Sequence, residues 1–146
     1  MSIETKLAEL GITLPEAPAP AANYVPYVIS GNLLFVSGQI STAKGKLGAD
    51  LAVEAGTEAA RTCGLALLAQ ARAALGSLDR VKRVVKLGGF VNSTPEFTDQ
   101  PEVVNGCSNL MVEVFGDKGR HARAAVSAPA LPRGVAVEIE AIFEIE

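Results

Sequence analysis

Arg123 is the residue whose surroundings point most clearly to chemistry. It lies in "GRHARAAVSAPALPRG" (119–134), and in an extended strand it shares one face with Ala125 and Ser127. Core strands usually carry bulky branched side chains, because these suit a pleated surface, so the small neighbours predict open space beside the guanidinium. A guanidinium in a small cavity binds a planar carboxylate through two parallel hydrogen bonds. We therefore predict that Arg123 binds a carboxylate.

Glu138 is the second candidate, in the alternating strand "VAVEIEAIFEIE" (135–146). It lies one short hairpin beyond Arg123 and could share its face. Two interpretations stay open: a structural Arg–Glu ion pair, or a glutamate kept ionised by the arginine that orients or deprotonates a water. The small residues Ala125 and Ala136 favour the second interpretation, because an ion pair needed only for stability requires no empty space. That pair of groups predicts hydrolysis of a small molecule bearing a carboxylate.

Periodicity predicts the elements that position these two residues. Helical spacing and capping residues indicate helices at 3–10, 53–75 and 99–115, with a Pro- and Ala-rich arm at 14–23. Strands are expected at 24–30, 33–40, 80–93, around Arg123 and at the end of the chain. This order predicts an α+β sandwich, in which a mixed sheet carries two helices packed on one face. The uncovered face predicts an oligomer.

Composition limits the classes of function. A net charge of −3 argues against a nucleic-acid binder that works by bulk electrostatics. One histidine and no Cys/His cluster argue against a zinc site, and no apolar stretch approaches the ~20 residues that span a bilayer. The start of the chain does not resemble a signal peptide, so we expect a cytoplasmic protein with two buried, reduced cysteines. The basic cluster of Arg80, Lys82, Arg83 and Lys86 fits a solvated strand or turn better than an RNA track.

Three motifs carry a resemblance to a known family: "SGQI" (37–40), "ALGSLDRVKRVVKLGGFVNS" (74–93) and "ARAAVSAPALPRGVAVEIEAI" (122–142). From about Asn23 to Glu144 the sequence resembles the reactive intermediate deaminase family (RidA, YjgF/YER057c/UK114), in its longer-armed subgroup. The resemblance implies a chorismate-mutase-like fold for residues 23–146, preceded by a helix and arm at 1–22. It also implies a homotrimer with ligand clefts between subunits, and hydrolysis of 2-aminoacrylate or 2-iminopropionate to a 2-keto acid and ammonia, without metal or organic cofactor.

The resemblance assigns roles residue by residue. Arg123 takes the position of the carboxylate-binding arginine and Glu138 that of the acid that positions water. The remaining substrate-binding positions are Tyr24, which lines the cleft, Ser37 and Gly38 in the loop beside it, Asn105 on a helix, and Ala125, which replaces a frequent cysteine and acts through its backbone. Two other functions stay open: a non-enzymatic trimer that binds small carboxylates as a sensor or chaperone-like module, and a ribonuclease or translation inhibitor, as some members have been described.

Overall fold

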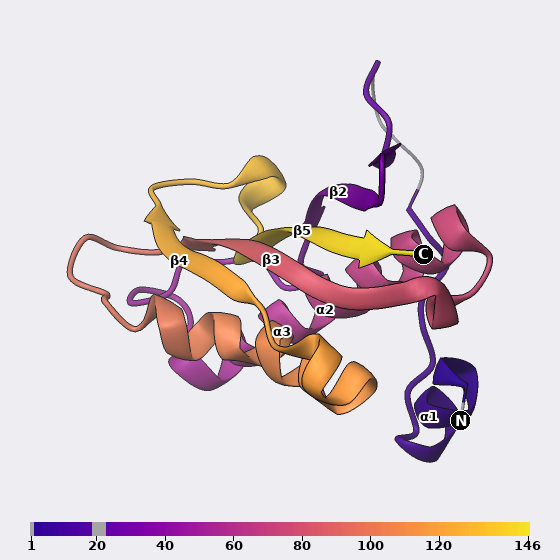
Figure 1. The fold of residues 1–146 in the computed structure, drawn as a ribbon. Helices are drawn as coiled ribbons and strands as arrows, with labels where there is room; N and C mark the ends of the chain where they lie inside the picture. Colours follow the sequence, from indigo (N-terminus) through magenta and orange to yellow (C-terminus); the bar gives the residue numbers. More distant parts are fainter. Residues whose placement is uncertain (1, 19–22) are drawn as a thin grey trace.

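A mixed five-stranded sheet forms the centre of the computed structural model, which describes residues 2–18 and 23–146 (Figure 1). The strands lie in the order β1-β2-β5-β3-β4, with bounds Tyr27–Ser30 (β1), Leu33–Ile40 (β2), Val81–Asn92 (β3), Ala122–Ala128 (β4) and Val137–Ile145 (β5). Neighbouring strands run antiparallel except β3 and β4, which are parallel. The parallel pair is possible because a helix connects the two strands and crosses over one face of the sheet.

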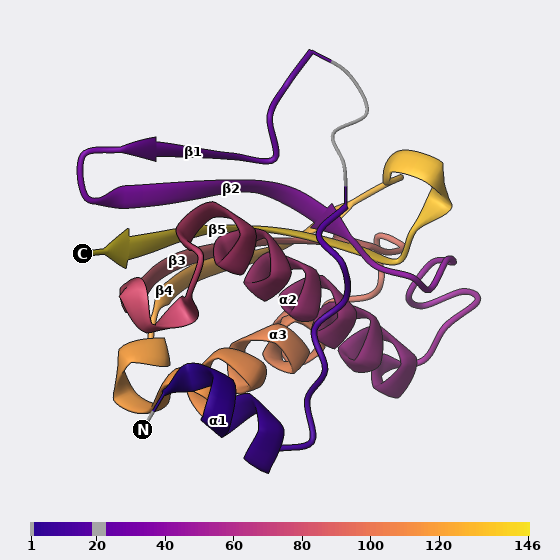
Figure 2. The same ribbon diagram turned by 90° about the vertical axis from the view of Figure 1, so that its right-hand side faces the viewer.

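Two helices, α2 (Val53–Leu75) and α3 (Gln100–Phe115), cover one face of the sheet (Figure 2). Alternate side chains of the strands meet the helices in a mainly aliphatic core that includes Leu34, Val84, Leu87, Ile139 and Phe143. Both cysteines are free and buried there, as the sequence predicted. The expected α+β sandwich with two helices on one face is therefore confirmed.

A glycine contact fixes how α3 lies on α2. Gly106 of α3 packs on the carbonyl of Thr57, and a Cβ at position 106 would overlap that carbonyl oxygen. Thr57 in turn donates a hydrogen bond from its hydroxyl to the Glu102 carbonyl oxygen, over 3.3 Å. The two helices therefore approach closely at this point.

The N-terminal helix α1 (Ile3–Glu9) lies outside this sandwich and contacts α3 and the short 3-10 helix η1 (Leu78–Arg80). Ser2 caps it by accepting a hydrogen bond from the Thr5 amide. The arm then runs without regular structure through 12–18, and the Gln70 side chain of α2 donates to the Pro18 carbonyl oxygen over 2.9 Å. The rest of the predicted arm, residues 19–22, lies outside the described residues.

The predicted hairpin between the Arg123 strand and the last strand is wrong. β3 lies between β4 and β5, and its Leu87 pairs with Arg123 on one side and with Ala141 on the other. The connection from β4 to β5 contains a 3-10 turn, η3 (Pro132–Gly134), and it joins two strands that do not pair with each other. The error arose because turn residues indicate a reversal of the chain without indicating which strands it joins.

The face of the sheet opposite the helices carries exposed apolar side chains, namely Val28, Phe35, Ile40, Phe90 and Val126. No helix of the described residues covers it (Figure 2). An uncovered apolar sheet face of this kind is typical of a surface that binds another chain.

Among the described residues, no helix combines the length and the hydropathy needed to cross a membrane.

Candidate functional site

Arg123 lies on the helix-covered face of the sheet, at the edge strand β4. Its Nη1 donates a hydrogen bond to Ser108 Oγ over 3.0 Å, and its Nη2 donates to the Pro101 carbonyl oxygen over 3.2 Å. Both acceptors belong to α3, so the guanidinium is held against the first half of that helix. Ala125 follows on the same face of β4 and is half-buried. The guanidinium has five N–H groups, and two of them make these bonds to the described residues.

Glu138 lies on the opposite face of the sheet. Its strand neighbours in register are Phe90 of β3 and Ile40 of β2, both of which are exposed on the uncovered face. The predicted shared face of Arg123 and Glu138 is therefore wrong within one chain, and no ion pair joins these two described residues. The cause is β3, which separates the two strands and sets their registers independently.

A β-bulge in β2 makes room for the Glu138 carboxylate. The pairing of β2 with β5 shifts register between Val36 and Gln39, which places Gly38 beside Glu138. A Cβ at position 38 would overlap the Glu138 Oε2 atom, so a side chain there would displace the carboxylate. Gly38, which the resemblance placed in the binding loop, therefore acts by leaving space for the acid.

Glu138 opens into a cavity of about 430 Å³ at the edge of β2 that β1 leaves unpaired. Its lining also includes Tyr24, Gly38, Gln39, Gln70 and Pro18.

Burial raises the pKa of Glu138 above its usual 4.5, and the negative charge of Glu140 raises it further. The expectation that Arg123 keeps this carboxylate ionised is therefore wrong within one chain. A carboxyl group with a raised pKa is suited to take and return a proton near neutral pH.

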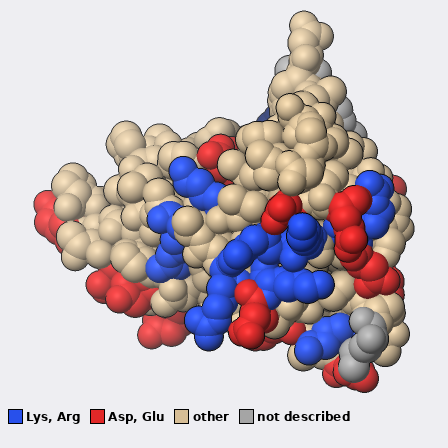
Figure 3. Space-filling view, in the orientation of Figure 1, with Lys and Arg blue, Asp and Glu red and all other residues tan. Residues whose placement is uncertain are grey.

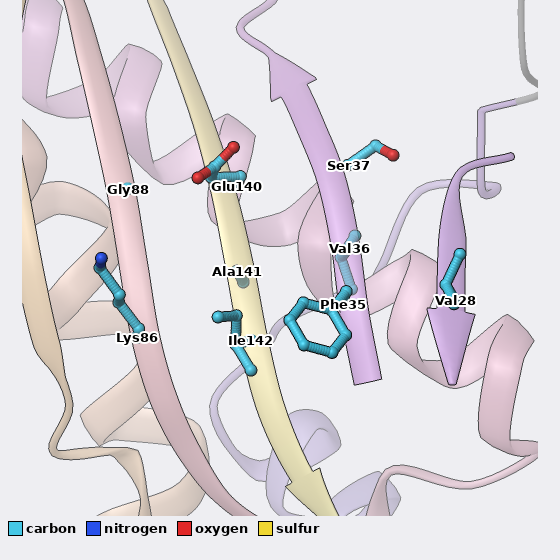
Figure 4. A pocket seen from close by; sticks show the side chains of 9 residues that line it. All are labelled: Val28, Phe35, Val36, Ser37, Lys86, Gly88, Glu140, Ala141 and Ile142. Carbon is cyan, nitrogen blue, oxygen red and sulfur yellow. The ribbon is translucent and has the colours of Figure 1, made fainter. Parts of the chain in front are cut away.

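The other predicted residues divide between these two places. Asn105 is exposed on α3, on the Arg123 side, and Tyr24 lies on the Glu138 side. Ser37, on β2, lines a separate, smaller cavity of about 270 Å³ on the uncovered face, and its hydroxyl donates to the Val25 carbonyl oxygen over 3.0 Å (Figure 4). One chain therefore holds one group of predicted residues around Arg123 and another around Glu138, with Ser37 at the smaller cavity, and does not bring them together.

The sequence analysis missed several polar residues at these places. Gln70 is 1% exposed in an apolar helix face, and its Nε2 lies 3.5 Å from Gln39 Oε1 at the cavity wall. A lone amide within an otherwise apolar helix face was a usable signal. Ser108 contacts both Arg123 and His121. Ser108 and His121 lie 13 positions apart in the sequence, and neither gave such a signal.

The basic cluster expected at 80–86 lies at the end of η1 and on β3, and Lys and Arg side chains gather on this side of the molecule (Figure 3). All four cations are exposed, and Arg80 donates from Nε and Nη2 to the Glu146 carbonyl oxygen. Arg83 donates to the Arg120 carbonyl oxygen over 2.6 Å. Two of these four cations therefore contribute hydrogen bonds that tie chain segments together.

Comparison with known proteins gives the family. A family model described as "YjgF/chorismate_mutase-like, putative endoribonuclease" matches residues 4–143. The chain belongs to the YjgF/RidA-like family. The resemblance and the chorismate-mutase-like fold expected from the sequence are thus confirmed.

Relatives in the YjgF/RidA-like family match nearly the whole chain. Protein TCP17 of Trypanosoma cruzi is 53% identical over 150 residues, which cover 98% of this chain and 94% of TCP17. The structure of a "putative endoribonuclease" from Shewanella oneidensis MR-1 is 34% identical with a TM-score of 0.96, and the match covers 99% of this chain and 100% of that one. E. coli TdcF, solved with bound serine, is 26% identical with a TM-score of 0.66, over 90% of this chain and 94% of TdcF.

Proposed function

We propose that this YjgF/RidA-like protein is a homotrimeric deaminase that hydrolyses small 2-imino and 2-enamino acids to 2-keto acids and ammonia. The observation that carries the proposal is the separation of Arg123 from Glu138 on opposite faces and at different edges of one sheet. Each chain then supplies one group that binds a carboxylate and one that activates water, and a complete site needs two chains.

The positions of the two groups favour a ring. Arg123 lies on β4, at one edge of the sheet, and the Glu138 cavity lies at the unpaired part of β2, toward the other edge. A head-to-tail contact that joins these two surfaces is heterologous, and repeating it by a closing rotation gives a cyclic oligomer. The exposed apolar residues of the uncovered face would be buried in the same assembly. The family resemblance favours three subunits.

The chemistry follows from the two side chains. Arg123 of one subunit binds the substrate carboxylate through N–H groups not already given to α3. Glu138 of the next subunit takes a proton from a water as the water oxygen bonds to the imine carbon. The protonated Glu138 returns this proton to the nitrogen, which gives a carbinolamine. The carboxylate then takes the proton of the carbinolamine hydroxyl and passes it to the nitrogen, so that the C=O bond forms as the C–N bond breaks and the products are a 2-keto acid and ammonia. No step requires an electron acceptor or a metal.

The cavity favours a small substrate. Its polar side chains are those of Glu138, Gln39, Gln70, Tyr24 and Arg133, and the rest of the lining includes Ala66, Ile40, Pro26 and Pro132. The apolar part of this lining suits an imino acid with a short apolar side chain. Serine bound to E. coli TdcF is also a small molecule with a carboxylate and a nitrogen on the neighbouring carbon, which supports this class of ligand.

Ammonia release tests the proposal directly. 2-Iminopropionate is generated in situ by an amino-acid oxidase, and its hydrolysis is followed with and without the purified protein. We expect faster hydrolysis with wild type, and the buffer rate with the Arg123→Ala variant. Wild-type protein that assembles but leaves the rate unchanged would favour a non-enzymatic trimer that binds small carboxylates.

RNA binding is the second candidate, because exposed cations gather over β3 (Figure 3). Arg83 and Lys82 are partly committed to other contacts, through the Arg120 carbonyl oxygen and Glu144. The single histidine, His121, is engaged with Ser108 and Gly119. These contacts favour the deaminase over a nuclease that needs paired acid and base groups. Cleavage of single-stranded RNA that survives in the Arg123→Ala variant would support the second candidate.

A further inference from the structure

A row of hydrogen bonds links Arg123 to the turn that precedes its strand. Arg123 Nη1 donates to Ser108 Oγ over 3.0 Å, and Ser108 Oγ lies 2.9 Å from His121 Nε2. On the other side of the ring, His121 Nδ1 lies 2.6 Å from the Gly119 carbonyl oxygen. Ser108 belongs to α3 and His121 directly precedes β4, so the row joins the edge strand to the helix that covers it.

The direction of each hydrogen bond follows from the groups present. The Gly119 carbonyl oxygen can only accept, so His121 carries its hydrogen on Nδ1 and donates there. In a neutral imidazole Nε2 is then an acceptor, and the Ser108 hydroxyl donates to it. The Ser108 oxygen still has lone pairs, which accept the Arg123 N–H. All donors and acceptors of the row are thus matched.

The electrostatic surroundings favour this neutral form of His121. Burial lowers the pKa of His121 below its usual 6.5, and the positive charge of Arg123 lowers it further, against an opposing contribution from the hydrogen bond to Gly119. From α3, the neighbouring Cys107 faces the same region, and burial raises the pKa of its thiol to about 12, so it carries no charge near neutral pH. The imidazole therefore stays an acceptor at Nε2.

We propose that Ser108 and His121 are positioning residues that hold the Arg123 guanidinium in the orientation that binds a carboxylate. The inference rests on the proposed function, because it gives Arg123 the role of carboxylate ligand. A free arginine side chain at a strand edge samples many rotamers, and binding a ligand would have to order it. Bonds from Nη1 to Ser108 and from Nη2 to the Pro101 carbonyl oxygen restrict it before the ligand arrives, which reduces that cost.

A hydrogen-bonded serine and histidine are also the signature of a nucleophilic serine. Here the Ser108 oxygen accepts a hydrogen bond from a cation, which makes it a weaker nucleophile. Neither of the two cavities described above is lined by Ser108. The arrangement therefore fits a support for Arg123 better than an acyl-transfer site.

The first test measures the mobility of the Arg123 guanidinium by NMR, with no ligand needed. The signal is assigned by its loss in Arg123→Lys. We expect slow rotation of the guanidinium N–H groups in wild type and in Ser108→Thr, which keeps the hydroxyl, and faster rotation in Ser108→Ala. Ser127→Ala is the matched control, because it removes a hydroxyl from the same face of β4 that bonds Ser93 instead. Equal rotation rates in Ser108→Ala and wild type would overturn the proposal.

The second test measures ligand affinity by calorimetric titration with pyruvate. We expect roughly three- to tenfold weaker binding in Ser108→Ala, the size of one lost hydrogen bond, and a smaller change in Ser108→Thr. His121→Phe should weaken binding in the same direction, and Ser127→Ala should match wild type. With the imino acid as substrate, the loss in Ser108→Ala should appear in KM rather than in kcat, because the water-activating group is untouched.

The two tests separate this inference from the proposed function. If wild type neither binds pyruvate nor speeds imine hydrolysis, the proposed function fails, and the NMR rates still decide whether Ser108 restrains Arg123. If wild type binds pyruvate, Arg123→Ala does not, and Ser108→Ala binds as tightly as wild type, the positioning role is wrong while the deaminase proposal stands.

Discussion

Arg123 and Glu138 lie on opposite faces of the sheet, and β3 separates their strands. Leu87, the partner of Arg123 in β3, is buried under the helices, whereas Phe90, the partner of Glu138, is exposed on the uncovered face. Two groups placed in this way cannot act on one small molecule within one chain. The predictions below test whether a second chain completes the site.

Mixed subunits should recover activity that each variant lacks. In a ring, every site takes Arg123 from one subunit and Glu138 from its neighbour. Random 1:1 mixing of Arg123→Ala and Glu138→Gln subunits then restores both groups at about a quarter of the sites. The measurement is imine hydrolysis after co-refolding, with light scattering to verify a trimer of about 45 kDa, three times the 15.1 kDa chain. Mixed rings with no activity, or a stable monomer, would contradict the shared site.

Arg123→Lys should weaken pyruvate binding by about tenfold or more although it keeps the positive charge. The reason is that an ammonium lacks the planar fork that donates two parallel hydrogen bonds to a carboxylate. Calorimetry gives the affinity, and thermal melts of the same samples check the fold. An unchanged affinity in Arg123→Ala would show that the carboxylate binds elsewhere.

Glu138→Gln should lower kcat by about 10²- to 10⁴-fold, because an amide cannot take a proton from water. The same variant should melt at a higher temperature than wild type at neutral pH. The pKa of Glu138 is raised in the folded state, so the folded chain binds more protons than the unfolded chain, and the carboxylate costs stability as pH rises through the folded-state pKa.

The stability difference between Glu138→Gln and wild type should shrink below about pH 4.5, where the carboxyl group is protonated in both the folded and the unfolded chain. Thermal melts at neutral and acidic pH measure this difference. A variant that is less stable than wild type at neutral pH would mean that the Glu138 carboxylate is paired with a cation in the assembled protein.

Gly38→Ala should reduce kcat by tenfold or more while pyruvate still binds. A Cβ at this position overlaps the Glu138 carboxylate and must displace it, whereas Arg123 is on the other face. Gly88→Ala is the matched control, since its Cβ would crowd the Glu140 carboxylate instead, at 2.9 Å from Oε2. Comparable losses of kcat in both variants would argue against a specific role for Glu138.

His121 should titrate below its usual pKa of 6.5, and Arg123→Ala should raise its pKa. Removing the arginine removes a positive charge that disfavours the imidazolium, while the burial of the ring remains. The chain has one histidine, so its ring protons give a single NMR titration curve. A pKa that falls in the variant would place another charge, rather than Arg123, beside the ring.

Local patterns in the sequence predicted much of the fold. The helix expected at 53–75 has these bounds in the structure, and Gly76 ends it with φ 80° and an N–H bond to the Arg72 carbonyl oxygen. The alternation in the last strand correctly placed Val137 and Ile139 on one face and Glu138 on the other. These features depend on residues a few positions apart, so the sequence alone carries them.

Tertiary structure decided how the two candidate site residues, Arg123 and Glu138, are related. Strand alternation assigns faces within a strand, but the order of strands depends on pairings between distant segments, here the insertion of β3 between β4 and β5. The contact of His121 with Ser108 likewise exists because α3 crosses over β3 and returns beside β4. The sequence therefore determined which residues could bind a carboxylate and activate water. Long-range strand pairing determined that one chain holds these residues apart.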